Sequence, residues 1–350
     1  MQNKRIDILD GFRVLAILIV MLYHFYSSFL NHYQYNFDSS IFHFGHLGVQ
    51  FFFIISGFVI FMTLKNTKNL LEFIKKRYMR LMPGMLVCSI ITFSIYNIFD
   101  TTFYPPAKDF KNLLFSNTFI SPSVPNKLFN THLDYIDSSY WSLWVEIIFY
   151  GLISILYFLN KRYAILNYSI IAIGSTILWY FFGTEENVLN ISIHNKIHKI
   201  INYIPFINLL IWFLVGIVIS KLFINTKNYS YNFYLIFLFV LIFITSKDIE
   251  VKYFTGISAL IWFIFLYKNH WLNFLGGKLI AKLGRSSYSI YLIHQMIGVL
   301  IIIKLSPYFG ENNWIIPIAL IVLSLVFGLF SFKYLEKPIG KMLQNILFKK

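Results

Sequence analysis

The feature that most constrains this chain is the recurrence of apolar runs about twenty residues long. An α-helix rises 1.5 Å per residue, so roughly 20 residues cross a hydrocarbon core about 30 Å thick. Hydrophobic residues make up 57% of the 350 residues and charged residues only 13%, whereas a soluble globular protein carries roughly 25% charged residues. The sequence therefore predicts an all-α, polytopic membrane protein.

The apolar runs can be placed along the chain. No small-residue cleavage site follows the first run, which is full length, so we interpret it as a retained helix and not as a cleaved signal peptide. Ten transmembrane helices are expected, at about residues 12–31, 47–64, 82–99, 142–159, 163–182, 205–224, 231–246, 252–268, 286–304 and 314–333.

The basic residues are distributed unevenly between the two sides of the predicted helices. With Arg13 left out, 21 Lys and Arg residues fall at the termini and in every second loop, and the remaining loops hold 8. Because loops rich in Lys and Arg stay in the cytoplasm, this distribution predicts that both termini are cytoplasmic. Topology thus explains most of the net charge of +15, and no nucleic acid is expected as a partner.

Cysteine and histidine usage argues against a metal centre. Cys88 is the only cysteine, which excludes an internal disulfide and a cysteine-rich metal site, and we expect it to be a packing residue. His32, His43 and His46 lie in a short outer loop without a carboxylate or Cys at ligand spacing among them. We therefore expect these three to be interfacial residues that help to shape an outer surface, and not metal ligands.

Arg13 and His24 lie eleven residues apart on the first predicted helix, roughly 16 Å along its axis. Ionisable residues inside a membrane are costly and are therefore functional candidates. Neutral imidazole can accept a hydroxyl proton near pH 7, so His24 is a candidate general base, and a helix-packing histidine is the alternative. Arg13 would lie near a membrane face, where its side chain could also extend to the interface.

Two further ionisable side chains fall inside predicted helices. His294 would lie about 12 Å into the ninth helix, within reach of the layer that holds His24. Glu146 lies one turn inside a helix that enters from the outer side, and a carboxylate there must face a cavity or a partner. It could orient an imidazole or accept a hydrogen bond from a hydroxyl, and a structural bond to Trp or Tyr is the alternative.

Phosphate and sugar binding have their own candidate residues. Arg77 and Arg80 are three residues apart and share a helix face on the cytoplasmic side. Arginine offers bidentate donors to phosphate, and ordinary flanking charge or lipid head-group contact is the alternative. Ser56 lies at mid-depth, where small residues also serve close helix packing. Trp141 ends the long outer loop 100–141 and could stack on a sugar or form part of an interfacial aromatic belt.

Taken in order, these segments resemble the motifs of the acyltransferase-3 family of integral-membrane enzymes that acylate bacterial surface carbohydrates. The resemblance rests on six motifs spread over residues 5–338 and not on any single one. The matching residues are Leu9 to Arg13 with His24; Gly48-Val49, Phe51-Phe52 and Ser56-Gly57-Phe58; Arg77 and Arg80 before Pro83; Trp141-Ser142-Leu143 with Glu146; Ser287-Tyr288, Tyr291-Leu292 and His294; and Glu336-Lys337-Pro338.

The resemblance implies transfer of an acyl group, usually acetyl, from cytoplasmic acyl-CoA to a hydroxyl of a surface carbohydrate (O-antigen, other lipopolysaccharide, capsule or exopolysaccharide) at the outer face of the cytoplasmic (inner) membrane. Acetyl-CoA would be the donor, and no metal is expected. Residues 1–350 would form a single integral-membrane domain without a fused extracytoplasmic domain. The implied site residues are, for catalysis, His24, Glu146 and His294; for acyl-CoA, Arg13, Arg77 and Arg80; and for the acceptor, Ser56 and Trp141.

A protein of a different class remains open on the sequence, namely a transporter or exporter of a glycan or a lipid-linked sugar. In it, His24 and Glu146 would relay protons or bind substrate. An exporter has no obvious need for the pair Arg77 and Arg80, and the sequence has no internal repeat of the kind found in inverted-repeat transporters. A third possibility, an inactive scaffold for glycan assembly, is disfavoured because Arg13 and His24 are both present.

Overall fold

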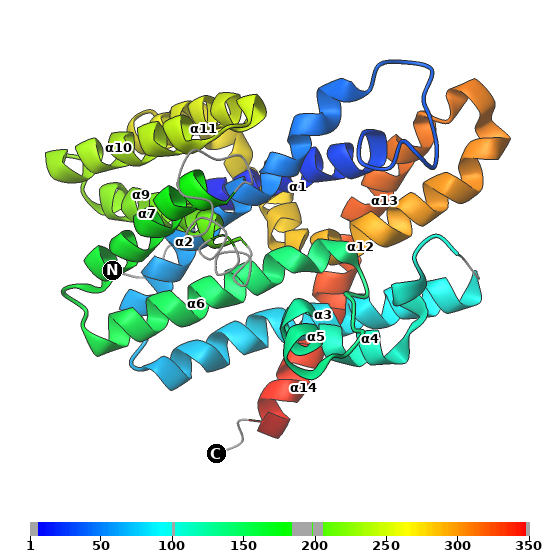
Figure 1. Ribbon diagram of the computed structural model, residues 1–350, viewed down its shortest axis with the longest axis horizontal. Helices are drawn as coiled ribbons and strands as arrows, with labels where there is room; N and C mark the ends of the chain where they lie inside the picture. Colours follow the sequence, from blue (N-terminus) through cyan, green and yellow to red (C-terminus); the bar gives the residue numbers. More distant parts are fainter. Residues whose placement is uncertain (1–5, 100–101, 184–197, 199–205, 348–350) are drawn as a thin grey trace. The chain divides into compact units, whose positions relative to one another are not determined.

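The computed structural model describes residues 6–99, 102–183, 198 and 206–347, and within them the chain forms helices and no strand (Figure 1). The prediction of an all-α membrane protein is confirmed. The chain divides into two compact units: unit 1 comprises residues 1–49, 74–144 and 273–350, and unit 2 comprises residues 50–73 and 145–272. Residues 100–101, which begin the long outer loop, and residue 205, which begins a predicted helix, lie outside the described residues.

A described α-helix overlaps each of the ten predicted segments. Nine segments are long and apolar enough to cross a membrane, and the tenth, α10, has 17 residues, about 26 Å of helix. The α-helices are α1 (Asp7–Tyr26), α2 (Gly48–Lys65), α3 (Leu70–Ile98), α4 (Phe110–Ser116), α5 (Ser123–Phe129), α6 (Trp141–Leu159), α7 (Ala164–Phe182), α9 (Leu210–Ile224), α10 (Tyr229–Thr245), α11 (Ile249–Tyr267), α12 (Lys278–Phe309), α13 (Ile315–Ser331) and α14 (Lys337–Leu347).

The predicted ends of the helices were less accurate than their positions. The helix predicted at 12–31 begins at Asp7 and ends at Tyr26. It begins early because acidic side chains in the first turn interact favourably with the helix dipole. It ends early because side chains from the following loop bond to its last turn. The hydroxyl of Tyr33 donates to the Phe25 carbonyl at 3.0 Å, and that of Tyr35 to the same carbonyl at 2.7 Å. Both bonds satisfy the Phe25 carbonyl in the last turn of α1, where the helix ends.

Helices α3 and α12 begin well before their predicted segments. Helix α3 begins at Leu70, where the Asn69 side chain accepts from the Glu72 backbone N–H at 2.9 Å and the Glu72 carboxylate accepts from Lys68 N–H at 2.9 Å. These bonds form a capping arrangement that starts a helix in polar surroundings. Helix α12 likewise begins at Lys278, so both helices extend past their apolar segments.

In unit 1, helix α1 packs against α12 and α13 at positions where glycine allows close approach. A Cβ on Gly284 would lie 2.0 Å from the Asp10 carbonyl oxygen, and a Cβ on Gly298 would lie 2.4 Å from the Phe25 ring. Small residues at membrane helix contacts let backbones approach closely. The two glycines of α12 therefore fix the axial position and rotation of this helix against α1. Helix α1 carries His24, and α12 carries His294.

In unit 2, helix α9 forms the centre, and its residues from Leu210 to Ser220 are all buried. It packs against α7, α10 and α11, and Phe213 stacks on Phe149 with ring centroids 4.2 Å apart. The crossing with α2 depends on two glycines, because a Cβ on Gly216 would lie 2.0 Å from the Ile54 carbonyl oxygen and one on Gly57 would lie 2.1 Å from the Phe213 carbonyl oxygen.

The Gly216→Ala substitution tests this crossing. The added methyl group has no room against the Ile54 backbone, so we expect a loss of about 1–3 kcal/mol in the free energy of unfolding, the usual cost of overpacking. Thermal unfolding of the purified protein in detergent measures the loss. Gly151→Ala is the matched control, since a Cβ on Gly151 meets no atom within 4 Å. Equal behaviour of the two variants would contradict the close crossing.

Candidate active site

Two histidines face each other inside unit 1. His24 lies in the last turns of α1 and His294 in the middle of α12, and their ring centroids are 5.1 Å apart. His294 is fully buried, whereas His24 is partly exposed. The structure thus brings together the two imidazoles that the sequence places at a similar depth.

The hydrogen bond of His294 indicates which of its nitrogens carries the proton. Its Nδ1 lies 2.7 Å from the Tyr291 carbonyl oxygen, which can only accept, so Nδ1 carries the hydrogen and Nε2 keeps a lone pair. Among the described residues, Nε2 of His294 and Nδ1 of His24 are buried without a hydrogen-bond partner. Neither nitrogen is occupied by a hydrogen bond to a described residue, so the two facing rings offer polar atoms to a bound substrate.

The turn of α12 that carries His294 is held by the segment that precedes α6. Asp137 accepts a hydrogen bond from the Met296 backbone N–H at 3.1 Å, and the hydroxyl of Tyr140 donates to the Leu292 carbonyl at 3.1 Å. Asp137 also accepts from the backbone N–H and the hydroxyl of Ser139, at 2.9 and 2.7 Å. These bonds bracket His294 and fix its orientation.

Asp137 is a functional candidate that the sequence does not predict. Its side chain is fully buried, and its partner Met296 lies 159 residues away in sequence. Burial raises the pKa of Asp137 to about 6, and the hydrogen bonds from Ser139 and Met296 oppose that rise. The one sequence feature that could have drawn attention to Asp137 is its position directly before Ser138, where an apolar helical segment begins.

Arg13 lies near the start of α1 and forms an ion pair with Asp10, three residues earlier. Asp10 is buried, with 1% of its side chain exposed, and Arg13 remains 23% exposed. A partly exposed guanidinium can be approached by an anion from outside the protein. The role of Arg13 toward acyl-CoA stays a prediction.

Arg77 and Arg80 both lie on α3, and Arg80 has a carboxylate neighbour. Its Nη1 lies 3.9 Å from Glu336 Oε2, and its guanidinium carbon lies 5.5 Å from the centre of the Tyr288 ring. Glu336 is largely buried and also accepts a hydrogen bond from the Ser289 hydroxyl. Arg80 therefore lies at the protein surface beside a buried carboxylate. An incoming phosphate would compete with Glu336 for its guanidinium.

Glu146 and Ser56 belong to unit 2 and bond to each other. The hydroxyl of Ser56 donates to Glu146 Oε1 at 2.6 Å, and the hydroxyl of Tyr150 donates to the same oxygen. Glu146 thus has the structural tyrosine bond that the sequence left open as an alternative. It nevertheless links Ser56 of α2 to α6, and Trp141, the first residue of that helix, is partly exposed. The catalytic role of Glu146 and the acceptor roles of Ser56 and Trp141 stay predictions.

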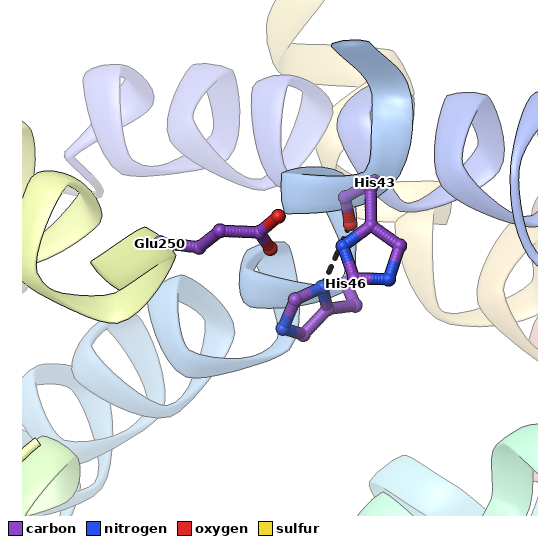
Figure 2. Close-up of side chains that lie close together, drawn as sticks. All are labelled: His43, His46 and Glu250. Atoms are coloured by element: carbon purple, nitrogen blue, oxygen red, sulfur yellow. Dashed lines mark hydrogen bonds between the residues drawn. The ribbon is translucent and has the colours of Figure 1, made fainter. Parts of the chain in front are cut away.

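His43 and His46 lie together on η1 (Ser40–Leu47), as Figure 2 shows, with ring centroids 5.4 Å apart. The Nδ1 of His46 lies 2.7 Å from the His43 carbonyl oxygen, and both rings contact the Tyr23 ring. A structural metal site takes about four protein ligands. Two imidazoles do not complete such a site within the described part of unit 1, and we assign no metal to them.

The comparison with protein families decides the class of this chain. The model of the acyltransferase-3 family, described as an acyltransferase domain, matches residues 6–332. The chain belongs to the acyltransferase-3 family. The resemblance inferred from the six motifs is thereby confirmed, and the two facing histidines lie inside the matched region.

Named relatives in this family are O-acetyltransferases. The chain is 28% identical to O-acetyltransferase OatA of Staphylococcus aureus (strain NCTC 8325 / PS 47) over 364 residues, which cover 95% of this chain and 57% of that protein. It is 28% identical to the O-acetyl transferase of Shigella phage Sf6 over 149 residues, which cover 40% of this chain and 43% of that protein. The chain therefore spans less than two thirds of these relatives' length. No solved structure matches it.

Substitution of Asp137 tests the segment that holds His294. In Asp137→Asn an amide NH₂ replaces one of the two acceptor oxygens, so it faces either the Ser139 donors or the Met296 N–H. We therefore expect the free energy of unfolding at pH 7 to fall by about 1–3 kcal/mol. Asp134→Asn, at an exposed aspartate of the same segment, is the control. Thermal unfolding in detergent measures both, and an unchanged Asp137→Asn variant would contradict this role.

The pH dependence of stability gives a second test of Asp137. Its pKa of about 6 in the folded protein exceeds the value of roughly 3.9 in an unfolded chain. The folded state therefore binds more protons between pH 4 and 6, and its contribution to stability falls as the pH rises through that window. We expect the unfolding temperature of the wild type, relative to Asp137→Asn, to decrease from pH 4 to 6 and to level off above. A flat difference would contradict the raised pKa.

Proposed function

We propose that this chain is an O-acetyltransferase that moves an acetyl group from cytoplasmic acetyl-CoA to a hydroxyl of a surface carbohydrate. Membership in the acyltransferase-3 family and the printed names of the relatives support the class of reaction. The carbohydrate acceptor, of the O-antigen, capsule or exopolysaccharide type, follows from the resemblance alone. Its place would be the cytoplasmic membrane, with both chain termini inside as the distribution of Lys and Arg predicts.

The observation that carries the proposal is the pair of unpartnered nitrogens on His24 and His294. His24 is the more exposed of the two rings, so it is the one that an acceptor hydroxyl reaches. The neutral imidazole of His24 takes the hydroxyl proton as general base. His294, held by the Tyr291 carbonyl, lies beside it and would bind or orient the substrate.

The transfer step follows from this arrangement. As His24 takes the proton, the acceptor oxygen forms a bond to the thioester carbonyl carbon of the donor. The carbon–sulfur bond then breaks, and the CoA thiolate leaves and takes up the proton from the His24 imidazolium. No covalent acyl-enzyme is required, because a single base serves both proton transfers.

The donor's phosphates would be held by Arg13, Arg77 and Arg80. Two guanidiniums on one helix offer several donors to a phosphate, and Arg80 is 41% exposed, which leaves it accessible. Glu336, 3.9 Å from Arg80, would release it when phosphate arrives. The acceptor role of Ser56 and the catalytic role of Glu146 rest on the sequence resemblance.

The His24→Ala variant tests the base. We expect transfer of labelled acetyl from acetyl-CoA into the host's surface glycan to fall by about 10²–10⁴-fold, the usual contribution of a general base. The assay uses membranes with equal amounts of each protein. His270→Ala is the control, because His270 is an exposed histidine far along the chain. Full activity of His24→Ala would refute the role of His24, and no transfer by the wild type into a glycan known to be acetylated would favour an exporter.

The double change Arg77→Ala with Arg80→Ala tests the donor site. Loss of phosphate contacts raises the KM for acetyl-CoA and leaves kcat nearly unchanged if they bind donor and transition state equally. We therefore expect transfer to fall at low acetyl-CoA and to recover at high concentration. Lys75→Ala with Lys76→Ala removes the same charge from the same helix as a control. An unchanged KM in the double arginine variant would place the donor elsewhere.

A further inference from the structure

Unit 2 contains a cavity of about 770 Å³ that takes no part in the proposed reaction. It lies along α7, α9 and α10, and one end is lined by four basic residues, while isoleucines and a leucine of α7 line its length. We call it the basic groove and define its cations as Lys65, Lys161, Arg162 and Lys221. Among the described residues that line it there is no Asp or Glu.

The cations of the basic groove are close to one another and lack a carboxylate. The Nζ atoms of Lys65 and Lys221 lie 5.1 and 5.4 Å from the centre of the same Phe61 ring, and Lys161 Nζ lies 5.9 Å from that of Tyr157. In the described part of the chain none of the four cations forms an ion pair. Cation–π contacts offset part of the repulsion between like charges, and an anion would offset more of it.

The rest of the basic groove is apolar and opens sideways. From Ile165 to Ile177 the lining follows α7 for roughly 18 Å. Leu166 is 55% exposed and Ile170 is 63% exposed, on a helix long and apolar enough to cross a membrane. This wall therefore faces the acyl chains of the bilayer. The Tyr234 hydroxyl, also part of the lining, is buried without a hydrogen-bond partner among the described residues.

We propose that the basic groove binds an anionic phospholipid, with its phosphate against the four cations and one acyl chain along α7. Basic pockets between transmembrane helices are suited to anionic head groups. A soluble phosphate would neutralise the cations but would leave the apolar part of the groove along α7 empty. A phospholipid fills both parts, so we favour the lipid over a free phosphate. The Tyr234 hydroxyl is placed to donate to an ester carbonyl of the lipid. This binding is independent of the acetyl transfer proposed above.

Thermal unfolding of the full chain in a neutral detergent tests the proposal. Phosphatidylglycerol at a hundredfold excess over its Kd should raise the unfolding temperature by roughly 3–5 °C, and native mass spectrometry should show one retained lipid. Phosphatidylcholine with the same acyl chains and inorganic phosphate should give no shift. An equal shift with phosphatidylcholine or with phosphate alone would overturn the proposal.

Removal of charge tests whether the cations of the basic groove, and not other surface cations, bind the lipid. Lys65→Gln with Lys221→Gln should weaken phosphatidylglycerol binding by roughly thirtyfold. Lys227→Gln with Lys268→Gln, which removes two cations outside the cavity lining, should leave it unchanged. Acetyl-CoA is tested in parallel. If its stabilisation is lost in the Lys65 and Lys221 variant, the cavity is a donor site and the lipid proposal fails.

Filling the apolar part of the basic groove tests the acyl chain without touching the charges. Gly174 lines the cavity, and a Cβ there meets no atom within 4 Å, so Gly174→Trp can fold while it occupies the groove. We expect it to abolish the phosphatidylglycerol shift, whereas Gly174→Ala keeps it. Gly256→Trp, on an exposed position with equally open space, is the matched control. An undiminished shift in Gly174→Trp would contradict the proposed position of the lipid.

Discussion

A bilayer interior supplies no water, so a polar group placed there has to find its partner within the protein. Three buried tyrosines follow that constraint: Tyr96 donates to the Met296 carbonyl, Tyr140 to Leu292 and Tyr168 to Leu210. Each bond joins two segments far apart in sequence and so contributes to the packing of its unit. The adjacent nitrogens of His24 and His294 do not follow it, and unsatisfied polar atoms of this kind are expected where a substrate is to be bound.

The sequence predicts the helices of this fold well because their apolar length is a local property. Their ends are not local, since α1 ends where Tyr33 and Tyr35 reach its carbonyls. The same distinction applies to the site. The depth of His24 and His294 follows from helical rise and could be predicted, whereas the bond of Asp137 to Met296 depends on the packing of distant segments and could not. The bond between Ser56 and Glu146 spans 90 residues and was missed for the same reason.

Basic residues that the positive-inside rule treats alike have different neighbours in the structure. Arg13 is paired with Asp10, and Arg80 lies beside Glu336, so each can exchange an internal carboxylate for a substrate phosphate. In such an exchange the carboxylate stays in the protein and competes with the phosphate, which suits a ligand that has to leave again. Lys65 and Lys221 have aromatic neighbours and form no ion pair within the described residues, which suits a ligand that stays. A transient donor and a resident lipid therefore call for different electrostatic surroundings.

The two tyrosine bonds at the end of α1 have a mechanical consequence. The Tyr33 hydroxyl also lies 3.2 Å from the carbonyl oxygen of His24 itself, so the loop after α1 bonds to the backbone of the residue assigned as the base. A ligand that displaced this loop would pull on the backbone of His24 through this hydrogen bond, so the position of the imidazole is mechanically coupled to the loop.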